Sequence, residues 1–160
     1  MKFTVFASLA LAVSTLALAG CDSNPQPKAG DMANAPEGIS VSDARLVLPA
    51  VKGNPGAVYF TVLNDSAHGA TIQGVAVKGA GSAMIHQTTM ANGMSEMQAM
   101  PQIGIPAKGS LTFKPGGLHV MAMELDGTLA KGGTTDVTLS FGGGDKAVFS
   151  AEILAAGDSR

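Results

Sequence analysis

The chain has 160 residues, of which 46% are hydrophobic and 14% are charged, and its formal net charge is -2. This length suits one domain with appended segments and leaves little room for a second hydrophobic core. Because the chain lacks the basic excess of nucleic-acid-binding proteins, we expect no nucleic-acid partner.

The first predicted element is an export signal. A short positive start is followed by an apolar run and then by small residues, which is the order of a secretory signal peptide. This run ends at residues 18–21, which read LAGC and resemble a bacterial lipobox. We therefore expect removal of residues 1–20 and acylation of Cys21, whose lipid would anchor the protein in a membrane. Asp22 resembles the signal that retains lipoproteins in the inner membrane, so we expect the protein on the periplasmic side of that membrane.

A tether is predicted for residues 21–38. From residue 23 onward this segment is polar, rich in proline and without hydrophobic periodicity. Such a composition is typical of flexible linkers. We expect the tether to lift a single folded domain, residues 39–156, off the lipid surface.

The folded domain is predicted to be all-β. Short runs rich in Val, Ile, Thr and Phe are separated by Gly, Pro, Asn and Asp, and none keeps a 3.6-residue apolar period over three turns. Short strands at this spacing are typical of a sandwich or a barrel. The predicted strands are 39–48, 58–64, 71–77, 83–89, 95–99, 110–113, 117–125, 134–141 and 147–154.

Histidines and methionines gather between residues 86 and 121. Ten residues separate His86 from Met97, and twenty-one separate Met97 from His119. His119 and Met121 flank a single residue, so a strand would direct both from one face, about 7 Å apart at the backbone. Their flexible side chains could then reach one ion.

The donors in this segment are uncharged and soft. Thioether sulfur combined with imidazole, without thiolate or carboxylate, selects Cu(I). Zinc prefers cysteine, histidine and carboxylate, and a blue-copper centre needs a cysteine thiolate, whereas the chain's single cysteine is Cys21. The candidate ligands for one Cu(I) ion per chain are His86, Met97, His119 and Met121.

Each candidate also has a plainer interpretation. His86 alone could be a surface histidine, Met97 could fill a gap in the core, and His119 could be a polar residue beside a core methionine at position 121. The other methionines of the segment could pack, lie exposed or contact the ion transiently. These are Met84, Met90, Met94, Met100 and Met123.

Three further polar residues, one outside this segment and two next to candidate ligands, are assigned other roles. His68 is expected to cap an exposed turn, and strand alternation should direct Glu96 and Glu124 away from the metal. No set of nucleophile, base and orienting residue is apparent, so we expect no enzymatic activity and no catalytic residue.

The spacing of His86, Met97, His119 and Met121 resembles the signature of the periplasmic copper chaperones called PCuAC. Residues 57–64 (AVYFTVLN) and 115–123 (PGGLHVMAM) are similar to strands of that family, and the similarity covers residues 39–153. The resemblance implies a cupredoxin-like Greek-key β-sandwich or barrel. Some members carry a His- and Met-rich tail, whereas this sequence ends in LAAGDSR, so we expect no second copper site carried by a tail.

The resemblance also implies a function. A monomeric chaperone would deliver Cu(I) to the copper-A site in subunit II of cytochrome c oxidase, or to a thiol-containing assembly factor of the Sco type. The alternative is a copper-buffering or resistance lipoprotein with no dedicated acceptor. A structural or adhesive lipoprotein that binds no metal is a further alternative.

Overall fold

The computed structural model describes residues 32–91 and 93–158, and its regular structure is almost entirely β-strand. Within these residues a short 3-10 helix, η1 (Met32–Asn34), precedes ten strands. The strands are β1 (Ile39–Val47), β2 (Gly56–Asn64), β3 (Ala70–Val77), β4 (Ala80–Ala91), β5 (Met94–Ala99), β6 (Ile103–Ile105), β7 (Gly109–Phe113), β8 (Leu118–Leu125), β9 (Thr134–Phe141) and β10 (Lys146–Leu154). The all-β prediction is confirmed.

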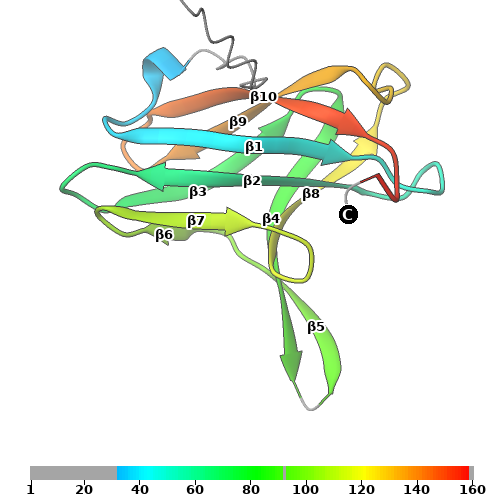
Figure 1. Ribbon diagram of the computed structural model, residues 1–160, viewed down its shortest axis with the longest axis horizontal. Helices are drawn as coiled ribbons and strands as arrows, with labels where there is room; N and C mark the ends of the chain where they lie inside the picture. Colours follow the sequence, from blue (N-terminus) through cyan, green and yellow to red (C-terminus); the bar gives the residue numbers. More distant parts are fainter. Residues whose placement is uncertain (1–31, 92, 159–160) are drawn as a thin grey trace, which may run out of the picture.

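These strands form a continuous sheet in the order β5-β4-β8-β7-β2-β1-β10-β9-β3-β6. Neighbouring strands are antiparallel except in the pairs β1–β10 and β7–β8. Strand β3 also contacts β4, and β6 contacts β7, so the sheet curls into a sandwich (Figure 1). This arrangement places β5, β4 and β8, the strands that carry the candidate ligands, side by side.

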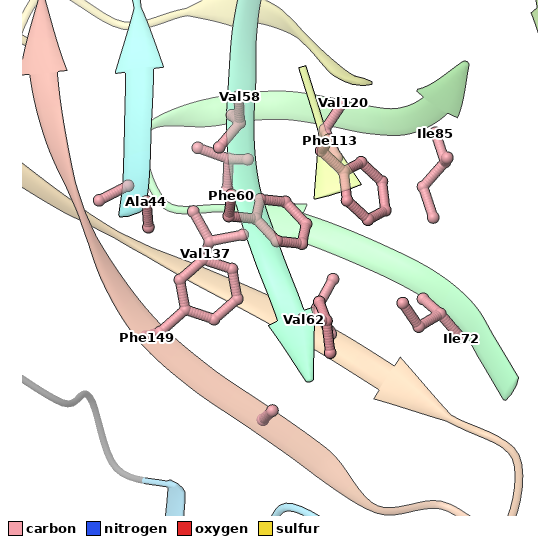
Figure 2. Close-up of a cluster of buried hydrophobic side chains, with 14 of the residues drawn as sticks. Ala44, Val58, Phe60, Val62, Ile72, Ile85, Phe113, Val120, Val137 and Phe149 are labelled. Atoms are coloured by element: carbon pink, nitrogen blue, oxygen red, sulfur yellow. The ribbon is translucent and has the colours of Figure 1, made fainter. Parts of the chain in front are cut away.

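Alternation along each strand turns apolar side chains toward the core. In β2, buried positions alternate with more exposed ones. Phe60 of β2 stacks on Phe113 of β7, with the ring centroids 4.2 Å apart, and its centroid lies 5.0 Å from that of Phe149 in β10 (Figure 2). Because aromatic rings bury large areas, this cluster joins three strands through a few side chains.

A buried asparagine fixes the end of the sandwich where β2 leads into β3. Asn64 is fully buried, and its Nδ2 donates hydrogen bonds to the carbonyl oxygens of His68 at 2.8 Å and Pro106 at 3.1 Å. Its Oδ1 accepts hydrogen bonds from the backbone N–H and the hydroxyl of Ser66. The side chain of Asn64 thus ties the β2–β3 loop to the loop between β6 and β7.

Strands β4 and β5 form a hairpin that extends away from the sandwich (Figure 1). The start of β4, residues 80–82, is rich in small residues with low strand propensity and was not predicted; pairing with β8 makes it a strand. Gly93, in the connection, has a φ of 77°, a conformation that favours glycine. All residues of β5 are exposed, so the hairpin presents its side chains to solvent.

The last residues of the predicted tether that the structure describes, from Met32 onward, pack on the sandwich. Met32 and Ala35 pack against the core, and η1 contacts β10. Sequence periodicity could not reveal this segment because one short turn has no period. The predicted signal peptide, Cys21 and Asp22 lie outside the described residues. In the part of the chain that is described, no helix has the length and apolar character to span a membrane.

Candidate metal centre

His86 and His119 lie directly opposite each other in the ladder between β4 and β8. Directly opposed residues of an antiparallel pair project from the same face of the sheet. The two imidazole rings are nearly parallel, with an angle of 24° between their planes and 6.1 Å between their centroids. Strand pairing therefore brings together two histidines that are far apart in the sequence.

The ring of His119 is held in a defined orientation. Only 7% of the residue is exposed, and its Nδ1 lies 3.0 Å from the carbonyl oxygen of Gly117. A carbonyl oxygen can only accept a hydrogen bond, so in the neutral ring Nδ1 carries the proton and Nε2 keeps its lone pair. Protein metal sites commonly orient their histidines by such a hydrogen bond to the second ring nitrogen.

The ring of His86 has a nitrogen available for a ligand. Its Nδ1 is buried and has no hydrogen-bond partner among the described residues. Buried polar atoms in folded proteins are nearly always paired, so an unpaired one calls for an explanation. A metal ion bound at this nitrogen would satisfy it.

Met121 lies on the same face as His119, as the spacing of two residues predicts. It is half-buried, and Met84 lies directly opposite it on β4. Met84 is 48% exposed and shares the face of His86. Met84 was not among the four predicted ligands, although its spacing of two residues from His86 indicates that it shares this face.

Met97 reaches the same face from β5. It lies opposite Thr88, while Ala99 lies opposite His86. Met97 is thus a diagonal neighbour of His86, at about 7–8 Å by the usual spacing of such neighbours. With 54% of its surface exposed, Met97 is the most accessible of the four candidates. The fold therefore brings His86, Met97, His119 and Met121 to one face of three adjacent strands.

The polar residues assigned other roles lie elsewhere. Glu96 is exposed and, by alternation, projects from the face opposite to that of Met97. Glu124 is exposed, with a φ of 55°. The exposed His68 lies in the β2–β3 loop, where its carbonyl oxygen bonds to Asn64. Among the described residues, no group of three or more His, Cys, Asp or Glu side chains could hold a metal ion.

The chemistry of this face follows from its donors. Two neutral imidazoles and neighbouring thioethers form a soft to borderline set, and such a set suits Cu(I) better than oxygen-seeking cations. We call the face that carries His86, Met97, His119 and Met121 the donor face. The exposed Met97 leaves one side of the donor face open to solvent. An ion could therefore be exchanged there without unfolding of the sandwich.

Tyr59 and Arg45 border the donor face. Ala57 of β2 lies opposite Met121, and Tyr59 follows two residues later on the same face. Arg45 pairs with Tyr59 across β1 and β2, and its guanidinium lies 5.1 Å from the centre of the phenol ring. Burial raises the pKa of Tyr59 above its ordinary value of 10.0, and the nearby charge of Arg45 opposes the rise.

We predict that the phenol of Tyr59 titrates above pH 10 in the folded protein. Because the fold favours the neutral phenol, the contribution of Tyr59 to the free energy of unfolding should be constant below about pH 10 and should be lost as the pH rises from there through the folded pKa. The chain has one tyrosine and no tryptophan, so tyrosinate absorbance reports this residue alone. Replacing Arg45 with methionine should raise the midpoint further, and a native midpoint below that of the unfolded chain would contradict the prediction.

Comparison with known proteins identifies the family. Residues 39–153 match the family described as "Putative lipoprotein LpqE-like". The chain belongs to the LpqE-like family. A relative of this LpqE-like chain, "Putative lipoprotein Lxx21020" of Leifsonia xyli subsp. xyli (strain CTCB07), is 32% identical to it over 135 residues, which cover 84% of this chain and 80% of the relative.

Solved structures of similar proteins confirm the fold of this LpqE-like domain. The Cu(I) form of DR1885 from Deinococcus radiodurans has a TM-score of 0.60 at 29% identity, over 89% of this chain and 87% of that one. The copper-bound PCuAC domain from PmoF2 has a TM-score of 0.62 at 20% identity, over 81% of this chain and 97% of that one. The predicted PCuAC resemblance and cupredoxin-like β fold are thus confirmed.

Proposed function

We propose that this protein is an extracytoplasmic Cu(I) chaperone that binds one ion through His86, Met97, His119 and Met121. The observation that carries the proposal is the pairing of His86 with His119 on a face that also holds both methionines. The contact of Nδ1 of His119 with Gly117 leaves the lone pair on Nε2, Nδ1 of His86 lacks a partner among the described residues, and Glu96 projects from the other face. These features suit a soft monovalent ion.

The relatives support both the ion and the location. DR1885 was solved with Cu(I), and it is similar to this chain over most of both lengths. The Leifsonia relative carries the name of a lipoprotein, which agrees with acylation at Cys21. We therefore infer that a lipid anchors the protein outside the cytoplasm, and Asp22 favours retention in the inner membrane.

The anchor would leave the donor face accessible. In Figure 1, η1, which lies nearest to the predicted lipid in the sequence, and the β4–β5 hairpin lie on opposite sides of the sandwich. The predicted tether therefore joins the sandwich on the side away from the hairpin, and it would permit an orientation in which the hairpin lies away from the membrane surface. This orientation would let a soluble domain of a partner approach Met97.

Release of the ion follows from the neutrality of its ligands. Two imidazoles and two thioethers leave the positive charge of Cu(I) uncompensated, so an acceptor with thiolates would bind it more strongly. Subunit II of cytochrome c oxidase, at its copper-A site, and Sco-type assembly factors are acceptors of this kind. The donor face would supply binding and orientation only, so the protein would not be an enzyme.

X-ray absorption of the Cu(I)-loaded protein tests the proposed ligands. Because two ligands are imidazoles and two are thioethers, we expect both nitrogen and sulfur neighbours, with the sulfur signal reduced in Met97→Leu and Met121→Leu. A Met32→Leu variant, altered in η1, is the control and should give the wild-type spectrum. A spectrum without sulfur neighbours in the wild type would contradict the ligand set.

Transfer to an acceptor separates a chaperone from a buffering protein. A chaperone should pass Cu(I) to an apo copper-A domain or to a reduced Sco-type protein faster than the ion is released into buffer. A protein that binds Cu(I) but transfers it to neither acceptor would instead be a copper-buffering or resistance lipoprotein.

A further inference from the structure

The donor face continues beyond the four proposed ligands toward the tip of the hairpin. Alternation along β4 places Met90 on the same face as Thr88 and His86. Met90 lies opposite Ser95, two residues before Met97 on β5, so Met90 and Met97 are diagonal neighbours. A second thioether therefore lies next to the most exposed of the proposed ligands.

Met94 offers a contrast within the same hairpin. It lies opposite Ala91 and therefore projects from the face opposite to that of Met90 and Met97. Met90 and Met94 are equally exposed, at 71% each. The two residues share residue type, hairpin and exposure, and they differ in the face on which they lie.

The surroundings of Met90 favour contact with a soft ion. The residues next to it on this face are the uncharged Thr88 and Ser95, while Glu96 projects from the other face. The hairpin extends from the sandwich (Figure 1), and in its register Met90 pairs with Ser95, which is two residues nearer the tip than Met97. An ion that leaves Met97 toward the tip would meet the sulfur of Met90.

We propose that Met90 and Met97 form an outer Cu(I) site through which the ion enters and leaves the pair of histidines. This proposal rests on the proposed function. During release, a bond forms between Cu(I) and the sulfur of Met90 as a bond to a histidine nitrogen breaks. Copper stays in the cuprous state, and the acceptor's ligand then takes the vacated position.

A kinetic comparison of two variants tests the outer site. Cu(I)-loaded protein is mixed anaerobically with excess bathocuproine disulfonate, and formation of the coloured chelate is followed. Met90→Leu should slow transfer by at least about fivefold, whereas its equilibrium affinity for Cu(I) should change less than about twofold. Met94→Leu should match the wild type in both measurements. The Met-to-Leu exchange nearly conserves volume, so neither variant should unfold.

Methyl NMR gives an independent measurement. With methionine methyl groups labelled with ¹³C, partial transfer of Cu(I) between protein molecules should broaden the signals of Met90 and Met97 and leave that of Met94 sharp. Equal rates for Met90→Leu and wild type, equal slowing by Met94→Leu, or a sharp Met90 signal would overturn the outer site. Loss of affinity in Met90→Leu as large as in Met97→Leu would also overturn it, since Met90 would then be a ligand of the inner site.

The two proposals fail in different ways. If the wild-type protein binds no Cu(I), the proposed function is wrong. If the wild type binds Cu(I) and the Met97→Leu and His119→Ala variants bind it weakly, the proposed function stands. In that case an unchanged rate in Met90→Leu rejects only the outer site.

Discussion

Replacement of His119 with alanine should lower the affinity for Cu(I) by more than about 100-fold. This loss exceeds the roughly 10–100-fold effect of removing a residue that only hydrogen-bonds to a metal ligand. The residue supplies one of two imidazoles in the proposed set, and its ring is already fixed by burial and by the hydrogen bond to Gly117. A donor that is oriented before binding loses little freedom when the ion arrives. Competition with a cuprous chelator measures the loss.

The control for this result is the histidine outside the donor face. His68 is exposed in the β2–β3 loop, and only its backbone carbonyl bonds to Asn64. His68→Ala should therefore bind Cu(I) as the wild type does. Circular dichroism should show the wild-type strand content for both variants. Wild-type affinity in a folded His119→Ala protein would remove His119 from the ligand set and, with it, the pairing on which the proposed function depends.

Replacement of Phe60 with alanine should lower the free energy of unfolding by about 3–5 kcal/mol. Phe60 is 1% exposed, stacks on Phe113 and approaches Phe149, so truncation removes contacts with two other strands and leaves a cavity. Such a loss is a large part of the roughly 5–15 kcal/mol that stabilises an ordinary domain. Chemical denaturation of the metal-free protein, followed by circular dichroism, measures the change.

A residue of the same strand provides the control. Leu63 of β2 is 45% exposed, so Leu63→Ala removes a side chain of similar type from the surface. We expect a change in unfolding free energy within about 0.5 kcal/mol. If Phe60→Ala does not fold, Phe60→Leu provides a milder test and should still be less stable than Leu63→Ala. If the Phe60 variant that folds is as stable as Leu63→Ala, the aromatic cluster contributes little to stability.

The strands could be predicted well from the sequence because the sandwich has a buried and an exposed face. Alternation in β2 and in β9 (Thr134–Phe141) encodes which residues enter the core, and the structure has both strands close to the predicted ranges. Strand β6 was missed, since three residues are too few for a period to appear. The start of β4 was missed because its small residues become a strand only through pairing with β8.

The donor face could be predicted only in part. Strand alternation was enough to place His119 and Met121 together. That His86 faces His119 depends on the register between β4 and β8, which is set by contacts across the whole sheet and leaves no local signal. The family resemblance supplied the grouping of ligands that local patterns could not, and it gave no indication of Met84 or Met90.

The opposed histidines also have a consequence for the evolution of this family. Because side chains alternate along a strand, a shift of β4 by one residue against β8 would turn His86 to the other side of the sheet. A relative with one amino acid inserted or deleted within β4 could therefore retain every histidine and methionine and still lose the ion. Counts of shared donors would overestimate how many relatives carry copper, whereas intact spacing between the donors would be the better guide.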